Sequence, residues 1–388
     1  MPASLQVLEK SREIAPAFDL PAYIRSGSST RLNRHYIPTL DGWRCVAIAL
    51  VLLCHGLTLS HPSSRLEKVL NPLVMNLGQQ GVSLFFAISG YLITTLLLSE
   101  YQATGGISLR GFYTRRIFRI LPPAYTYLAV IAILGAVGVL SLTHSEIPSA
   151  LFVYNNYWPS RSWFTQHFWS LSMEEHFYLL WPALLALCGL RRARWVALAG
   201  ILLTIFWRPF GLHAIHLAVP ELERTDMRLD AFLFACLLAL LVHNNRALQK
   251  HLATPVFHYG VLAVLMVGYA FALVYPMQLT KLAFQSFMLP LVIIPTTLMP
   301  AAALSRFLEL PLLRWLGRIS YSVYLWQQLV LHGDGTDLRS ALLGLTLKIP
   351  VIILVASASY YFIERPSMRR GRLLSSAGTK SFPRLCFR

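Results

Sequence analysis

Long apolar stretches recur along the chain and alternate with short polar or basic segments. One such stretch lies between Arg44 and His55, where every residue from Cys45 to Cys54 is hydrophobic. A helix that crosses a bilayer needs roughly 20 predominantly apolar residues. The pattern therefore predicts an all-α, polytopic membrane helix bundle with about ten transmembrane helices. The predicted spans are residues 43–61, 82–99, 123–142, 168–190, 195–212, 229–243, 256–275, 282–303, 315–332 and 341–363.

Composition agrees with this architecture and excludes a large soluble domain. The 388 residues are 55% hydrophobic and only 13% charged, with a formal net charge of +17. If the N-terminus is inside, 24 of the 34 Lys and Arg residues lie on the cytoplasmic side and 8 on the opposite side. Excess positive charge on one side is typical of cytoplasmic loops, so both termini are predicted to be cytoplasmic. Topology thus accounts for the basic charge, and no nucleic acid partner is expected.

The same pattern divides the chain into three parts. Residues 1–42 form a predicted cytoplasmic N-terminal tail without a cleavable signal peptide. Residues 43–363 form the membrane domain, and residues 364–388 form a basic cytoplasmic C-terminal tail that we expect to be flexible. The cysteines lack ligand or disulfide spacing and are interpreted as small hydrophobic residues, so no metal is expected.

Ionisable residues inside the predicted spans are the first candidates for chemistry. His55 lies roughly 16 Å along the helix axis from Arg44, past the middle of the bilayer. Glu174 is predicted at a similar depth and shares a helix face with Ser170 and Tyr178, whereas Glu175 points about 100° away. A carboxylate beside His55 would orient the imidazole as a general base. The alternatives are a histidine bonded to a neighbouring helix and glutamates that pair with arginines to hold helices together.

Further polar residues lie near both ends of these spans. Ser89 and Tyr91 flank Gly90 at the depth of Glu174, where helix packing is the alternative role. Arg116 and Arg119, preceded by Arg115, share a helix face at the inner mouth of the third span. Guanidinium pairs of this kind suit phosphate groups, although topology alone also explains basic residues there.

On the outer side, a charged cluster that includes Arg228 and Asp230 precedes the sixth span. The loop between the third and fourth spans adds asparagine, tyrosine and tryptophan residues. Polar groups mixed with aromatic rings suit a sugar, and solvated loops with interfacial tryptophans look the same.

Together these residues resemble the acyltransferase-3 family of integral membrane O-acyltransferases, which modify bacterial polysaccharides and related glycans. The resemblance runs nearly end to end and depends on the order of the motifs more than on any one of them. The motifs are Asp41-Gly42 with Arg44 and His55, Gly81-Val-Ser-Leu-Phe-Phe, Ser89-Gly90-Tyr91-Leu92, Arg115-Arg116-Ile-Phe-Arg119-Ile-Leu-Pro122, His167-Phe-Trp169-Ser170-Leu-Ser172-Met-Glu174-Glu175-His176-Phe177-Tyr178, Met227-Arg228-Leu-Asp230-Ala, Leu316-Gly317-Arg-Ile-Ser320-Tyr321-Ser322-Val-Tyr324-Leu and Glu364-Arg365-Pro366.

The resemblance implies an enzyme of the bacterial inner membrane, embedded in lipid by several spans. It implies that an acyl group, usually acetyl, passes from cytoplasmic acetyl-CoA to a hydroxyl of a glycan, such as a lipid-linked or surface polysaccharide. By the same resemblance His55 and Arg44 are the essential pair, and Glu174 assists His55. Arg116, Arg119 and Arg115 are expected to bind the coenzyme A phosphates. The expected substrate-binding residues are Arg228, Asp230, Ser170, Glu175, Ser89 and Tyr91.

Two features depart from the family pattern. Gln327 follows Tyr324-Leu-Trp where many relatives have a histidine, so that histidine's role does not carry over. The sequence ends soon after the tenth predicted span without a hydrolase-like domain. Acceptor handling is therefore expected to involve an envelope-assembly partner or no further protein.

Other readings stay open at this point. A succinyl donor, or a macrolide or lipid acceptor, fits the same class of enzyme. Ten spans with buried His, Glu and Arg also suit a proton-coupled secondary transporter of a small anion or glycan unit, although paired halves with corresponding broken helices are not evident. A non-catalytic scaffold is the third reading, in which His55 is structural.

Overall fold

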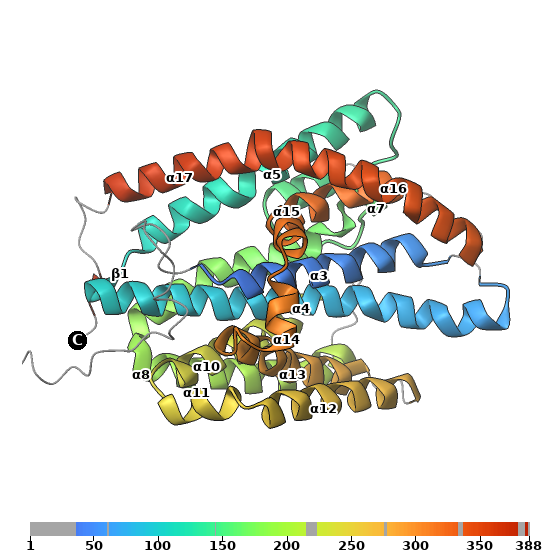
Figure 1. Cartoon of the computed structure of the whole chain (residues 1–388). Coiled ribbons are helices and arrows are strands. Elements are labelled where there is room, and N and C mark those ends of the chain that lie inside the picture. The colour runs from blue at the N-terminus through green and yellow to red at the C-terminus, as the bar shows by residue number, and fades with distance from the viewer. Residues whose placement is uncertain are drawn as a thin grey trace, which may run out of the picture.

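The computed structural model describes residues 36–59, 62–143, 145–214, 223–274, 278–332, 337–378 and 385–386. Helices dominate this part of the chain (Figure 1). The long helices are α3 (Pro38–Leu57), α4 (Arg65–Thr104), α5 (Leu109–Ala136), α8 (Phe168–Ala214), α10 (Asp230–His243), α12 (Pro255–Val274), α13 (Gln278–Leu298), α15 (Pro311–Leu331), α16 (Leu338–Ser359) and α17 (Arg365–Gly378).

Short elements connect these helices. They are α6 (Glu146–Leu151), the 3₁₀ turn η1 (Asn155–Tyr157), α7 (Trp163–Gln166), α9 (Thr225–Arg228), α11 (Arg246–Leu252), α14 (Ala303–Leu308) and the π-helical turn η3 (Tyr360–Glu364). A two-residue antiparallel pairing joins β1 (Gly106–Ile107) to β2 (Leu385–Cys386). The prediction of an all-helical membrane protein is confirmed at this level.

Five helical segments in the described part of the chain are long and apolar enough to cross a membrane. They are Pro38–Leu57, Arg65–Thr104, Leu109–Ala136, Lys281–Leu298 and Leu338–Ser375, and α10 with α11, bent by 120°, forms a candidate sixth span. Helix overlies each of the ten predicted spans. The count of ten spans and the cytoplasmic position of both termini stay predictions.

Helix boundaries differ from the predicted spans in two places. The second and third spans were predicted from residues 82 and 123, but their helices begin at Arg65 and Leu109. Pro122 and Pro123 lie within α5, which continues to Ala136. The fourth and fifth spans, both within α8, are two helices that meet at a kink, where Gly189 has a φ of 76°.

The segment after Glu364 is also more ordered than expected, since α17 is helical to Gly378. It lies alongside α5 (Figure 1). The contact is close at Gly371, where a Cβ atom would lie 2.6 Å from the Cβ of Phe118. The flexible end predicted for this region is therefore wrong as far as Gly378.

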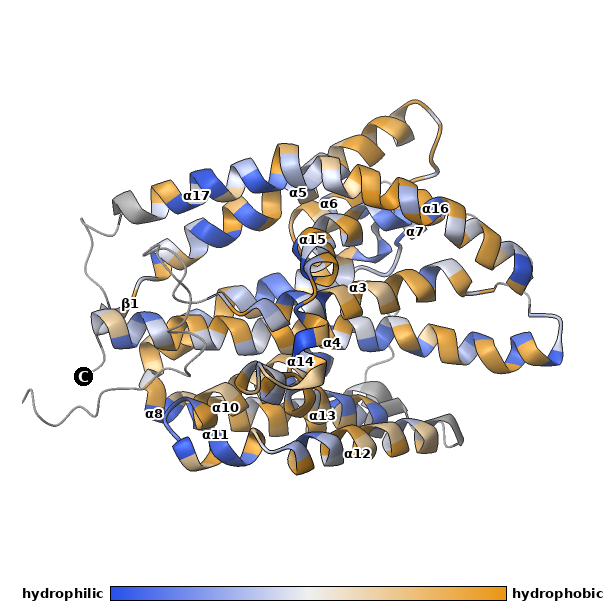
Figure 2. Ribbon diagram, in the orientation of Figure 1, coloured by the Kyte–Doolittle hydropathy of each residue, from blue (hydrophilic) through white to orange (hydrophobic). Residues whose placement is uncertain are grey.

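Polar residues collect at the ends of the bundle. Figure 2 shows apolar residues along most of the helical surface and hydrophilic residues on α17, α11 and the neighbouring part of α5. Large apolar side chains face outward along the helices, such as Val256, Leu347 and Phe206, at 85%, 75% and 73% exposure. Exposed apolar faces of this extent suit contact with lipid.

Close helix contacts set the position of α3 and α15. A Cβ atom at Gly317 on α15 would lie 1.8 Å from the backbone oxygen of Asp41 on α3. Only glycine permits this approach of the two backbones. Gly90 on α4 has the same function against the Phe232 carbonyl of α10, at 2.4 Å from its would-be Cβ. The packing thus brings α3, α4 and α15 together around the residues described next, with α15 lying between α3 and α16 (Figure 1).

Candidate active site

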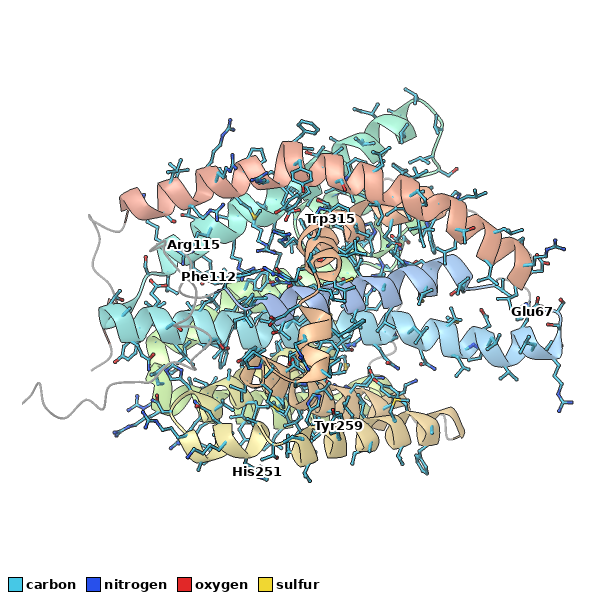
Figure 3. All side chains as sticks on the ribbon, viewed as in Figure 1. Glu67, Phe112, Arg115, His251, Tyr259 and Trp315 are labelled. Carbon is cyan, nitrogen blue, oxygen red and sulfur yellow. The ribbon has the colours of Figure 1, made fainter. Side chains whose placement is uncertain are left out.

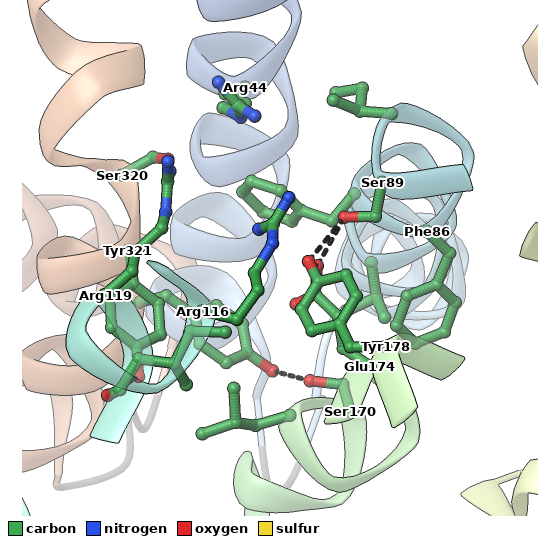
Figure 4. Close-up of a pocket in the computed structure, with 16 residues that line it drawn as sticks. Arg44, Phe86, Ser89, Arg116, Arg119, Ser170, Glu174, Tyr178, Ser320 and Tyr321 are labelled. Atoms are coloured by element: carbon green, nitrogen blue, oxygen red, sulfur yellow. Dashed lines mark hydrogen bonds between the residues drawn. The ribbon is translucent and has the colours of Figure 1, made fainter. Parts of the chain in front are cut away.

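A pocket opens between five helices, and half of the predicted site residues line it. Its polar lining includes Arg44 from α3, Ser89 from α4, Arg116 and Arg119 from α5, and Ser170, Glu174 and Tyr178 from α8 (Figure 4). Helix α15 adds Ser320, Tyr321 and Tyr324. Residues separated by more than 250 positions in sequence therefore meet at one site.

Glu174 is held by two hydroxyl groups inside this pocket. Ser89 Oγ and Tyr178 OH both donate to Glu174 Oε1, and these two hydroxyl oxygens lie 3.0 Å apart. Tyr178 follows Glu174 by four residues, so the α-helix places both side chains on one face. A carboxylate held in this way is oriented toward the pocket and can accept a proton or a hydrogen bond from a ligand.

Two arginines of α5 face the pocket without a carboxylate partner. The Arg116 guanidinium stacks over the Tyr178 ring, with its central carbon 4.5 Å from the ring centre. Within the described ranges, neither Arg116 nor Arg119 has a carboxylate oxygen within 4.0 Å. Arg44 differs, because its Nη1 pairs with Asp41 Oδ1 at 2.9 Å. Partly buried guanidinium groups without counter-ions favour an anionic ligand.

Arg115 does not belong to this pocket, contrary to the expected role in donor binding. Its guanidinium lies 3.7 Å from Glu100, and its side chain is 41% exposed. Figure 3 shows Arg115 near Phe112, at the opposite end of the bundle from Glu67. Adjacent positions on a helix face different directions, which separates Arg115 from Arg116.

His55 lies deeper along α3 and does not line the pocket. Its Nδ1 lies 2.8 Å from Oε1 of Gln327 on α15, and its ring packs edge-on against Trp163 at 5.3 Å between centres. The predicted contact between Glu174 and His55 is replaced by this pair, because Glu174 bonds to Ser89 and Tyr178 instead. The partner of His55 is thus an amide rather than a carboxylate.

The residues expected to bind the acceptor are mostly engaged within the protein. Arg228 donates to Gln79 Oε1 and Ser83 Oγ at 3.0 and 2.7 Å. Asp230 is fully buried in an ion pair with Arg208 at 2.6 Å.

Three other predicted residues differ in their setting. Tyr91 OH bonds to Thr297 Oγ1 at 3.0 Å in a separate apolar cluster, and Ser170 Oγ bonds to Tyr324 OH at 2.5 Å in the pocket wall. Glu175 lies outside the pocket lining, and its Oε1 has no hydrogen-bond partner among the described residues.

The polar loops near α9 are bonded to one another. Arg161 pairs with Glu223 at 2.5 Å, and Asn156 donates to Thr225 Oγ1 at 2.9 Å. Burial raises the pKa of Glu223, and the charge of Arg161 opposes that rise without cancelling it. Within the described part of this region, these charged and amide groups therefore bond to one another.

No group of three or more His, Cys, Asp and Glu residues is placed to hold a metal ion in the part of the chain that the structure describes.

Comparison with known families identifies the chain. The acyltransferase-3 model, described as an acyltransferase domain, matches residues 37–363. The chain belongs to this family. Helices in the matched range are also long and apolar enough to cross a membrane.

Curated relatives agree with this assignment. The peptidoglycan O-acetyltransferase OatA of Listeria monocytogenes is 28% identical over 88% of this chain and 57% of its own length. The putative peptidoglycan O-acetyltransferase YrhL of Bacillus subtilis is 29% identical over 92% of this chain and 57% of its own. A putative O-acetyltransferase of Staphylococcus aureus is 28% identical over 87% of this chain and 58% of its own. The chain thus spans less than two thirds of the length of these relatives. No solved structure gives a significant match.

Sequence reasoning missed several residues that shape the acyltransferase-3 site. Gln327 was noted only as a departure from the family, yet it holds His55. Tyr324 forms part of the pocket wall, and Trp163, considered only as a loop residue, packs on His55. Tyr324 and Gln327 lie three residues apart in the predicted span 315–332. A glutamine inside an apolar span was the sequence signal that could have pointed to this site.

Proposed function

We propose that this acyltransferase-3 protein is a membrane-embedded O-acyltransferase that moves an acyl group, most simply acetyl, from cytoplasmic acyl-CoA to a hydroxyl of a glycan. One observation carries the proposal. Arg116 and Arg119 present unpaired guanidinium groups to a pocket that also contains Arg44 of α3, the helix that bears His55.

Acetyl-CoA fits the pocket as donor because of its charge and shape. Its phosphates are the anions that a pair of guanidinium groups binds best. Its pantetheine arm is long, uncharged and flexible, so it can extend from the arginines toward the interior of the bundle. Arg44 and His55 are roughly 16 Å apart along α3, and the arm would have to cover that separation.

His55 is suited to the transfer step. In the proposed reaction, His55 accepts the proton of the acceptor hydroxyl. The oxygen of that hydroxyl attacks the thioester carbonyl. The new carbon–oxygen ester bond forms, the carbon–sulfur bond breaks, and the thiolate of coenzyme A leaves and takes up a proton. A variant of this step, in which His55 first carries the acyl group, uses the same residue.

The proposed acceptor is a glycan at or beyond the outer leaflet of the bacterial inner membrane. Two curated relatives are named peptidoglycan O-acetyltransferases, which supports a cell-wall glycan or its lipid-linked precursor as acceptor. The proposed topology is multi-pass with both termini cytoplasmic, and an envelope-assembly partner would present the acceptor.

The decisive experiment measures release of the coenzyme A thiol from acetyl-CoA by detergent-purified protein with a crude envelope glycan fraction. Wild type is compared with His55→Ala, and thermal unfolding confirms that the variant is folded. Release that depends on His55, with acetyl esters on the glycan, supports the proposal. Equal release by His55→Ala excludes the mechanism, and absence of release with acetyl-CoA and with succinyl-CoA excludes the activity.

A further inference from the structure

Gln327 of α15 is the hydrogen-bond partner of His55. The side chain of Gln327 is fully buried, and its Oε1 lies 2.8 Å from His55 Nδ1. An amide oxygen accepts hydrogen bonds and cannot donate them. With Oε1 facing the ring, this contact is a hydrogen bond when His55 carries its proton on Nδ1, which leaves the lone pair on Nε2.

The surroundings hold both partners in place. Trp163 packs edge-on against the His55 ring, and its Nε1 donates to the backbone oxygen of Gln328 at 2.7 Å. Oε1 of Gln328 accepts from the backbone N–H of His167 at 3.3 Å. Two adjacent glutamines of α15 thus tie α3, α7 and α8 together, and only Gln327 touches His55.

Few titratable groups surround His55. His167, between α7 and α8, interacts with His55 electrostatically, while α15 and α7 present the neutral Gln327 and Trp163. On α16, Lys348 donates to the His332 carbonyl at 3.2 Å, and Leu345 packs against Gly56. On α4, Gly78 packs against Cys54. The direct polar partner of His55 in the described structure is therefore Gln327.

We propose that Gln327 is a positioning residue that fixes the Nδ1-protonated tautomer of His55 and so directs the Nε2 lone pair to the transfer step. This inference rests on the proposed function for its kinetic consequences. In the other tautomer the reacting nitrogen has no lone pair, so the histidine cannot act as a base even when every side chain stays in place. Because the partner is neutral, His55 gains orientation without the charge that a carboxylate would add.

Two substitutions separate positioning from a merely structural role. Gln327→Leu removes the acceptor, so kcat is expected to fall at least 10-fold while KM for acetyl-CoA stays within about twofold, because the donor phosphates lie at Arg116. Gln327→Glu keeps the shape and the acceptor oxygen but adds a negative charge. The acidic limb of its kcat/KM profile is expected to move to higher pH, since a carboxylate stabilises the imidazolium form.

Gln328→Leu is the matched control. It removes an adjacent buried amide that does not contact His55, so kcat and the acidic limb are expected to stay close to wild type. A wild-type kcat in Gln327→Leu overturns the proposal, as does an unshifted acidic limb in an active Gln327→Glu protein. If Gln327→Leu does not fold, the near-isosteric Gln327→Glu variant decides.

A spectroscopic measurement separates this proposal from the proposed function. ¹⁵N spectra of histidine-labelled protein, with His55 identified by comparison with His55→Ala, are expected to show an Nδ1-protonated ring in wild type and loss of that tautomer in Gln327→Leu. This result together with inactivity toward every acyl-CoA would reject the proposed function and retain the inference. An Nε2-protonated His55 in wild type would reject the inference whatever the activity.

Discussion

Replacement of Arg116 by glutamine tests the donor site most directly. Among the described residues, no carboxylate lies within 4.0 Å of Arg116, so its replacement breaks no ion pair there. A hydrogen bond to a charged group contributes about 1.5–3 kcal/mol. Since about 1.4 kcal/mol corresponds to a tenfold change in affinity, Arg116→Gln is expected to weaken binding of coenzyme A roughly 10- to 150-fold. Arg116→Lys keeps the charge but not the planar fork, and an intermediate loss is expected.

The assay is titration calorimetry of coenzyme A with protein in lipid nanodiscs. Arg115→Gln is the matched control, because this arginine lies beside Glu100 and is 41% exposed. Exposed ion pairs contribute about 0–1 kcal/mol, so the affinity of Arg115→Gln for coenzyme A is expected to stay within about fivefold of wild type. Pantetheine, which has the arm but no phosphate, gives a second control and should bind wild type and Arg116→Gln equally well.

A wild-type affinity of Arg116→Gln for coenzyme A would refute a phosphate site at Arg116. An equal loss of affinity in Arg115→Gln would also refute it, because the effect would then come from net charge near the membrane. Equal losses for coenzyme A and pantetheine would show that the arginine contacts the arm instead of a phosphate.

Two further substitutions test the packing around the site. Gly317→Ala would place a methyl group 1.8 Å from the Asp41 backbone oxygen, so the free energy of unfolding is expected to fall by about 1–3 kcal/mol. Thermal unfolding in detergent measures this loss. Gly344→Ala, with open space around it, should leave the melting temperature unchanged. Arg208→Met leaves Asp230 charged and buried, so the free energy of unfolding is expected to fall by about 3–5 kcal/mol. The double variant with Asp230→Leu should recover most of this stability. No recovery would contradict an isolated ion pair.

The positions of the helices were predictable because a bilayer imposes a length on every apolar segment. The common depth of Ser89 and Glu174 followed from the same constraint, and these two side chains do meet. Helix ends were less predictable, since α4 and α5 extend beyond any plausible hydrocarbon layer as ordinary helices. Hydropathy detects where the lipid ends and carries little information about where the helix ends.

Partners across helices were not predictable from the sequence. Spacing predicted Glu174 and His55 at similar depths, but Glu174 lies in the pocket with Arg44, which precedes His55 by eleven residues on α3. The contacts of α15 with α3 bring Gln327 rather than Glu174 to His55. Arg115 lies beside Glu100 and Asp230 beside Arg208, and the sequence predicted neither pairing.

The pair formed by α3 and α15 connects the donor end of the site to His55. The two helices touch at two levels, where the Asp41 backbone meets Gly317 and where His55 meets Gln327. These levels are separated by 14 residues on α3, or roughly 21 Å, and by 10 residues on α15, or roughly 15 Å, so the helices run in the same direction at an inclination to each other. A shift of α15 at Gly317 must therefore move Gln327 relative to His55. Turnover and stability are accordingly expected to fall together in Gly317→Ala, while Arg116→Gln lowers donor affinity and leaves the melting temperature unchanged.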